Sequence, residues 1–222
     1  MGKALLGPIA SVVKGRIGNT VFVEMPNVGT VMRQWVYPSD PRTPAQIAFR
    51  ARVSQAARAF KALSSSEHSQ WVAYAKHVAE LRRLRGESGA PQPINVFIPL
   101  ATKILQMNST AEIPRTPPTS DFLGDTVVMS VIGISGNVRF TASCPNGPSA
   151  TTELLLQPLK SANRTPMPTF YRHQAFAAFT ESSLYYDIPL KPGYYAAAIR
   201  FVHSVTGQVS DLVQLGTVEV TS

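Results

Sequence analysis

Few residues in the sequence are spaced so that they could do chemistry together. Ser11 and Lys14 form a Ser-x-x-Lys pattern, in which an amine can take the proton from a nucleophilic hydroxyl group. The companion motifs of enzymes that use this pattern are missing from the chain. We therefore assign no catalytic residue and expect that the protein is not an enzyme.

The histidines and the cysteine give no metal or disulfide pattern. His68 and His77 are nine residues apart, which places them about 180° apart on an ideal helix. Neither these histidines nor His173 and His203 stand at metal-ligand spacing from a cysteine or an acid. Cys144 is the only cysteine, so no internal disulfide is expected. A phosphate-binding glycine loop is also missing, and we expect no metal and no cofactor.

The basic residues are the main candidates for binding a partner. Residues 1–110 hold 14 Lys or Arg and 5 Asp or Glu, a net charge of +9, whereas residues 111–222 hold 7 and 8, a net charge of −1. Such asymmetry favours a polyanion or an acidic protein surface as the partner of the first half. A solvated basic face is the alternative. The candidate binding residues are Lys14, Arg16, Arg50, Arg52, Arg58, Lys61, Arg82, Arg83 and Arg85.

Residues 38–85 are expected to position most of these cations on two helices. The first helix should begin with Thr43 as N-cap and Pro44 as first residue, and end near Leu63. Arg50, Arg58 and Lys61 fall within about a quarter of its circumference. Its predicted buried stripe comprises Phe49, Val53, Ala56, Phe60 and Leu63.

The second helix carries the remaining basic run. Ser64 and Glu67 form a capping box at its start, and Gly86 is expected to end it. Arg82, Arg83 and Arg85 stand just before that glycine. They either complement the negative end of the helix dipole or form a cluster that faces a ligand.

The rest of the chain divides at a proline-rich stretch. Short strands are predicted within residues 8–37, with a turn at Gly18-Asn19, and a third helix over residues 94–108. In that helix Pro99 should lie in the first turn. Residues 113–122 are the predicted linker. Seven strands of an antiparallel sandwich are predicted at 126–132, 137–143, 152–157, 174–180, 183–188, 194–203 and 207–220.

The predicted fold class is therefore an α+β N-terminal domain followed by an all-β domain. Residues 1–112 would combine a short β ribbon with a three-helix, hairpin-type bundle, and residues 123–222 would form the sandwich. Leu190-Lys191-Pro192-Gly193-Tyr194-Tyr195 resembles the corner that leads into strand F of a fibronectin type III or related immunoglobulin-like module. The spacing from Pro192 to either tyrosine is shorter than usual. The core tryptophan of such modules is missing, because Trp35 and Trp71 are in the other half.

Most of the chain resembles a loose set of uncharacterised phage and prophage-type proteins. The matching motifs are Gly-Arg-Ile-Gly at 15–18, Pro-Arg-Thr-Pro-Ala-Gln at 41–46 with Arg50, Leu63-Ser64 with Trp71, Phe97, and Pro117-Pro118. The resemblance implies a structural component of a virion or prophage and no enzymatic activity. The expected partners are other virion proteins and further copies of the chain, in a particle assembled from proteins made in the host cytoplasm.

Residues 56–76 resemble the last two helices of a high-mobility-group box, a DNA-binding fold. This resemblance carries the alternative hypothesis, in which the basic helical hairpin binds DNA and the sandwich is an accessory. No run of 18 apolar residues is present, so no membrane span is expected.

Overall fold

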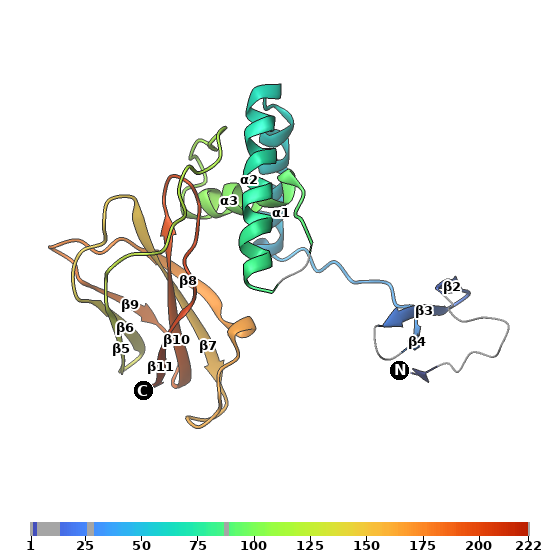
Figure 1. The fold of residues 1–222 in the computed structure, drawn as a ribbon. Coiled ribbons are helices and arrows are strands. Elements are labelled where there is room, and N and C mark those ends of the chain that lie inside the picture. The colour runs from blue at the N-terminus through green and yellow to red at the C-terminus, as the bar shows by residue number, and fades with distance from the viewer. Residues whose placement is uncertain (1, 4–13, 26–28, 87–88, 222) are drawn as a thin grey trace. The chain divides into compact units, whose positions relative to one another are not determined.

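A computed structural model describes residues 2–3, 14–25, 29–86 and 89–221 of the chain. Ser11 of the Ser-x-x-Lys pattern and the strand predicted around it lie outside the described residues. The chain falls into two compact units, Met1–Pro44 and Ala45–Ser222, and each is described by itself. Helices and antiparallel sheets are both present, so the fold class is mixed α+β (Figure 1).

The first unit is a small antiparallel sheet in the order β1-β4-β3-β2. Its strands are β1 (Gly2–Lys3), β2 (Gly15–Ile17), β3 (Thr20–Met25) and β4 (Gly29–Gln34). The predicted turn at Gly18-Asn19 is confirmed, because Ile17 pairs with Thr20 and Gly18 has a φ of 58°. The last strand of the unit stops at Gln34, so Trp35 lies beyond it rather than within it.

Three helices begin the second unit, namely α1 (Pro44–Lys61), α2 (Ser65–Leu84) and α3 (Pro93–Met107). The first helix starts at Pro44 as predicted, and the capping box of the second is confirmed. The backbone N–H of Ser64 donates to Glu67 Oε2 over 2.7 Å, and the N–H of Glu67 donates to Ser64 Oγ over 3.3 Å. Pro99 is the seventh residue of α3, so the expectation that it lies in the first turn is wrong.

The helices share a small aromatic core. Ala56, Trp71, Phe97 and Ala101 are buried together, and the rings of Trp71 and Phe97 meet edge to face with centroids 4.8 Å apart. The predicted stripe of α1 is wrong at its first position, since Phe49 is 55% exposed. The physical reason is that Phe60, Leu63 and their neighbours near the end of α1 pack on this core, whereas the first turns do not.

The remaining strands form two antiparallel sheets that share one core. A three-stranded sheet has the order β5-β6-β9 and a four-stranded sheet the order β11-β10-β7-β8. Buried side chains such as Phe140 of the first sheet and Leu154, Leu156 and Ile199 of the second belong to a single apolar cluster. The strands are β5 (Met129–Ile134), β6 (Asn137–Ala142), β7 (Ala150–Leu159), β8 (Arg172–Ala177), β9 (Tyr185–Pro189), β10 (Gly193–His203) and β11 (Val213–Val220).

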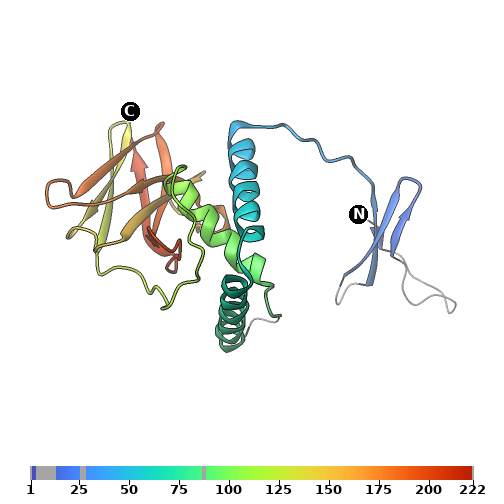
Figure 2. The same cartoon turned by 90° about the horizontal axis from the view of Figure 1, so that it is seen from above.

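Helix α3 connects the helical part to the sheets. In both ribbon views it lies between the sheets and the pair α1 and α2 (Figures 1 and 2). The turn after β10 approaches it so closely that a Cβ on Gly207 would lie 2.2 Å from the carbonyl oxygen of Leu100. Gly207 also has a φ of 73°, so glycine is needed there for both conformation and contact.

We predict that Gly207→Ala lowers the stability of the second unit by about 1–3 kcal/mol more than Gly136→Ala does. Gly136 is a matched control because its φ is 68° and nothing lies within 4 Å of a Cβ placed on it. Thermal and urea unfolding of the two variants would measure the difference. Equal losses would show that the close approach to α3 contributes nothing to stability.

Candidate functional site

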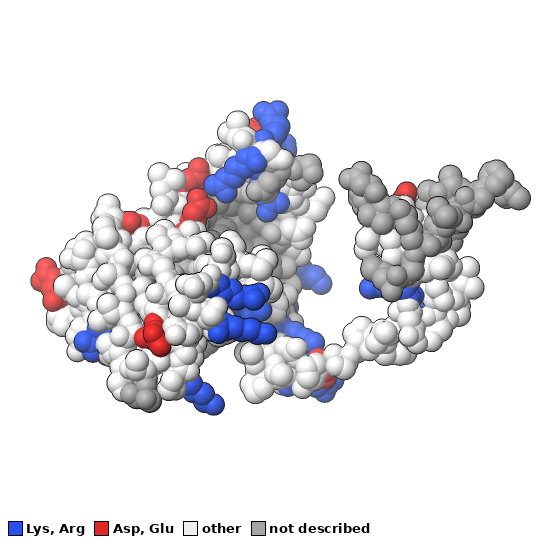
Figure 3. All heavy atoms as spheres, turned by 90° about the horizontal axis from the view of Figure 1, so that it is seen from below, with Lys and Arg blue, Asp and Glu red and all other residues white. Residues whose placement is uncertain are grey.

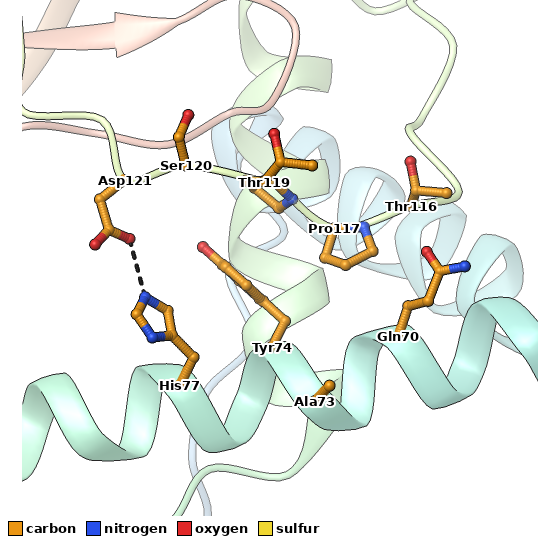
Figure 4. A pocket seen from close by; sticks show the side chains of 10 residues that line it. Gln70, Ala73, Tyr74, His77, Thr116, Pro117, Thr119, Ser120 and Asp121 are labelled. Carbon is orange, nitrogen blue, oxygen red and sulfur yellow. Dashed lines mark hydrogen bonds and ion pairs between the residues drawn. The ribbon is translucent and has the colours of Figure 1, made fainter.

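An open groove of about 740 Å³ lies between α2 and the proline-rich segment 116–121 (Figure 4). One face of α2, from Gln70 to His77, forms one wall, and the extended segment forms the other. Figure 4 shows Tyr74 reaching across the groove from α2 toward Ser120 and its neighbours. Burial raises the pKa of the Tyr74 hydroxyl group and is the largest of the effects on that pKa.

Side chains of the second unit hold the proline-rich segment in place. Trp71 Nε1–H donates to the carbonyl oxygen of Arg115 over 2.8 Å. The Arg115 guanidinium donates to both carboxylate oxygens of Glu67, over 2.6 and 3.0 Å. These bonds and those from Ser64 lower the pKa of Glu67 to about 2. At the other end of the segment, Gln208 Nε2 donates to the carbonyl oxygen of Ser120 over 3.0 Å.

The groove contains one pair of groups that can exchange a proton. His77 Nε2 lies 3.3 Å from Asp121 Oδ1 (Figure 4), and such a pair can orient an imidazole as a base. Both side chains are about half exposed. Within the described part of the chain, no hydroxyl or thiol group is hydrogen-bonded to this pair.

The described residues form neither a metal-binding cluster nor a membrane-spanning helix. No group of three or more His, Cys, Asp or Glu side chains within those residues is arranged to hold a metal ion. Likewise, no helix that they form has the length and apolar character needed to cross a membrane.

The predicted cations of the first unit, Lys14 and Arg16, both have partners within that unit. Lys14 Nζ lies 2.5 Å from Glu24 Oε2. The Arg16 guanidinium lies 3.6 Å from the centroid of the Trp35 ring, and its Nε–H donates to the carbonyl oxygen of Gly18 over 2.7 Å. The structure therefore uses these two cations to hold neighbouring strands and the chain beyond β4 together.

The predicted cations of α1 and α2 do not form one cluster. Arg58 and Lys61 lie near the start of α2, whereas Arg82, Arg83 and Arg85 lie at its end, roughly 25 Å away along the helix. All five are exposed, as is Arg50 in the first half of α1. Figure 3 shows Lys and Arg side chains spread over the second unit rather than gathered in one patch on the face drawn.

Arg52 differs from these residues because its side chain is half-buried. Its Nε atom is fully buried and has no hydrogen-bond partner. Its charge is one of the causes that lower the pKa of Lys103, after the larger effects of desolvation and of Arg200. Lys103 itself belongs to a second set of charged residues, which no local pattern in the sequence indicates.

Glu153 is the centre of that set. Its side chain is 0% exposed, yet it sits on β7 among apolar neighbours. Lys103 Nζ of α3 donates to both of its carboxylate oxygens over 3.1 Å. Arg200 Nε of β10 donates to Oε2 over 2.5 Å, and His173 Nδ1 of β8 lies 3.0 Å from Oε1. One buried carboxylate thus joins a helix to three adjacent strands.

The pKa of Glu153 is lowered to about 2. Desolvation, the largest single effect, raises the pKa, but the hydrogen bonds from His173 and Arg200 and the charge of Lys103 together outweigh it. A sequence signal for this site exists, because Glu153 is the one charged residue of its strand and precedes three leucines. Such residues are rarely buried unless they are paired. The partners of Glu153 are Lys103, His173 and Arg200, which are too far apart in the sequence to form a local pattern.

No family model matches the chain, and no curated protein is significantly similar to it.

We predict that Glu153 gives the protein a stability that depends on pH in the acidic range. Because its pKa falls from 4.5 to about 2 on folding, its contribution is fully present above pH 4.5 and is lost as the pH falls toward 2. The difference corresponds to about 3 kcal/mol. Urea unfolding of the wild type and of Glu153→Gln between pH 2 and pH 7 would measure it.

The variant should be less stable at pH 7 by about 3–5 kcal/mol, because it leaves buried cations without a counter-charge. It should also lose the acid-range slope. Asp187→Asn is the control, since Asp187 pairs with Arg139 over 2.7 and 2.6 Å at a site that is about one-third exposed. Parallel pH profiles for the wild type and Glu153→Gln would contradict the assignment.

Proposed function

We propose that this protein is a non-enzymatic structural component of a viral, phage-type particle. The first unit and the basic helices would dock on the shell, on neighbouring subunits or on the genome, and the two-sheet part would decorate the particle or contact other proteins. Its location would then be the virion, after synthesis in the host cytoplasm. The sequence resemblance and the surface of the first unit support this proposal.

The observation that carries the proposal is the small core of the first unit. This unit spans 44 residues, and only Thr30 and Val31 are buried among its described residues for which burial is known. Units of this size usually need a disulfide, a metal or association with another chain to be stable. The single cysteine, Cys144, is in the other unit, so association is the stabilisation we favour.

Large apolar side chains are available for such association. Ile17, Val36 and Tyr37 of the first unit are each more than two-thirds exposed. Ile47 and Phe49, in the first turns of α1, are more than half exposed. Exposed apolar side chains that gather near each other in the sequence favour an interaction surface over a solvated one.

We also infer that the part from β5 to β11 is an immunoglobulin-like module of the fibronectin type III kind. Its first, second and fifth strands form one sheet, and its third, fourth, sixth and seventh form the other, the arrangement expected of such a module. Tyr195 Oη donates to the carbonyl oxygen of Lys191 over 3.0 Å at the start of β10. This bond supports the tyrosine corner indicated by the sequence. Such modules commonly mediate contacts between proteins, which suits an assembly component.

We predict that Val36→Asp weakens self-association of the full-length protein at least tenfold, because a carboxylate would enter an apolar contact. Val128→Asp is the matched control, because Val36 is 72% exposed and Val128, in the other unit, is 71% exposed. Sedimentation velocity over a range of protein concentrations would measure both. Equal effects, or a wild type that is monomeric at every concentration and missing from purified particles, would overturn the proposal.

One observation favours the alternative of DNA binding. Arg82, Arg83 and Arg85 are all exposed at the end of α2, where cations also complement the helix dipole. If these residues bind the DNA backbone, affinity for duplex DNA should fall steeply with salt, and replacing all three by Ala should reduce that salt slope by about 3. If they only complement the helix, replacing them should leave the salt dependence of any DNA binding unchanged.

A further inference from the structure

The groove between α2 and residues 116–121 has an apolar middle and a charged end (Figure 4). Tyr74 and Pro117 line its middle, and both are half-buried, so part of each ring stays accessible. The Asp121 carboxylate stands at one end beside His77. Among the described residues that line the groove it is the one acidic residue, and its side chain is 47% exposed. A ligand that fits the groove should therefore combine apolar groups with a positive charge.

The walls of the groove are held in place by the protein itself. The Tyr74 ring meets the buried Trp71 ring edge to face, with centroids 5.8 Å apart. The opposite wall is fixed by the hydrogen bonds that Trp71 and Gln208 donate to the backbone at Arg115 and Ser120. A groove that is already formed in this way saves the ordering entropy that a mobile one would lose on binding.

The groove is long enough for about four residues of extended peptide. Its α2 wall runs from Gln70 to His77, a distance of roughly 10 Å along the helix axis. A polyproline II chain advances about 3.1 Å per residue, so a Pro-x-x-Pro segment spans roughly 9 Å. Such segments dock in aromatic-lined grooves, and their stiffness limits the entropy that they lose on binding.

The chain itself contains a segment of this kind, Pro38-Ser39-Asp40-Pro41, followed by Arg42. Residues 35–43 form no helix or strand, and residues 36–43 are all exposed. The prolines have a fixed φ, and they restrict the residues before them to extended conformations. The Arg42 side chain is 80% exposed, and its Nε lies 3.7 Å from Asp40 Oδ2. An ion pair this exposed is weak, so a partner's carboxylate can replace it.

We propose that the groove binds residues 37–42 of a second copy of the chain, an inference that rests on the self-association proposed above. The two prolines of the segment would lie against the rings of Tyr74 and Pro117, and Arg42 would pair with Asp121. Charge complementarity thus accompanies the fit between prolines and an aromatic groove. Because the segment and the groove are different surfaces, the contact can repeat from copy to copy, as an assembly requires.

The test is binding of a fluorescently labelled peptide of residues 36–45 to the full-length protein, measured by anisotropy. The wild type should bind the peptide saturably. Ala73→Arg should weaken binding at least tenfold, because Ala73 is an exposed residue of the groove wall and a long side chain there would fill the space. Ala51→Arg is the matched control, since Ala51 is an exposed alanine of α1 that does not line the groove. It should bind as the wild type does.

Changes in the peptide test which of its groups are recognised. Replacing both prolines by alanine should weaken binding about tenfold, because the ring contacts and the preset extended form are lost. Arg42→Ala in the peptide and Asp121→Asn in the protein should each weaken binding about two- to fivefold, as expected for an exposed ion pair. The two changes together should weaken it no more than either alone, because they remove the same pair.

No saturable binding by the wild type, or equal weakening by Ala73→Arg and Ala51→Arg, would overturn the proposal. Tighter peptide binding by protein whose own Pro38 and Pro41 are replaced by alanine, at concentrations where the wild type is monomeric, would show that the chain's own segment covers the groove. That result would overturn the choice of a second copy.

Sedimentation velocity separates this inference from the proposed function. Ala73→Arg should weaken self-association of the full-length protein. Self-association that Val36→Asp weakens and Ala73→Arg leaves unchanged would overturn the inference while the proposed function stands. A wild type that binds the peptide but never self-associates would instead overturn the proposed self-association.

Discussion

The carboxylate of Glu153 is completely buried, and such a charge is stable only where cations surround it. Lys103, His173 and Arg200 provide this environment from α3, β8 and β10. Because each partner comes from a different element, the ion cluster fixes the position of α3 on the four-stranded sheet. Helices α1 and α2 pack on α3 through Phe97 and Ala101, so their position on the sheet follows from the same cluster.

Polar contacts outside the cluster strengthen the junction between helices and sheets. Gln208, in the turn after β10, bonds to the backbone of Ser120, while Trp71 bonds to the backbone of Arg115. The proline-rich segment is thus held at both of its ends within the second unit. A stretch whose composition indicates a linker serves here as a strap along α2. Its prolines limit the chain entropy that is lost when the strap is fixed.

Local signals in the sequence were sufficient for most of the elements. The capping box at Ser64 and Glu67, the proline start of α1 and the turn at Gly18-Asn19 each depend on residues a few positions apart, and all three are confirmed. Each of the seven strand segments predicted after residue 125 also contains part of an observed strand. Patterns of period two suffice for such strands, because one face of each sheet packs on the shared core.

Features that depend on contacts distant in sequence could not be predicted in this way. The exposure of Phe49 reflects how far the helical core reaches along α1, which helical periodicity does not reveal. Pro99 is tolerated inside α3, although it cannot donate the hydrogen bond of that turn. The ion cluster needs residues 103, 153, 173 and 200 to converge, and the sequence indicates only that Glu153 is unusual for its strand. The basic residues singled out by composition proved to be dispersed along α1 and α2 and in the first unit.

The two units differ in the size of their buried cores. The second unit has a large apolar core and a paired buried carboxylate. The described part of the first unit leaves Ile17, Val36 and Tyr37 exposed, while Lys14 and Arg16 have partners within that unit. Lys14 and Arg16 therefore already interact with groups of the first unit itself. The exposed apolar side chains of that unit are the groups that remain for contact with a partner. A partner of that unit should therefore be recognised mainly by shape and apolar surface, which is how subunits of stable assemblies recognise each other.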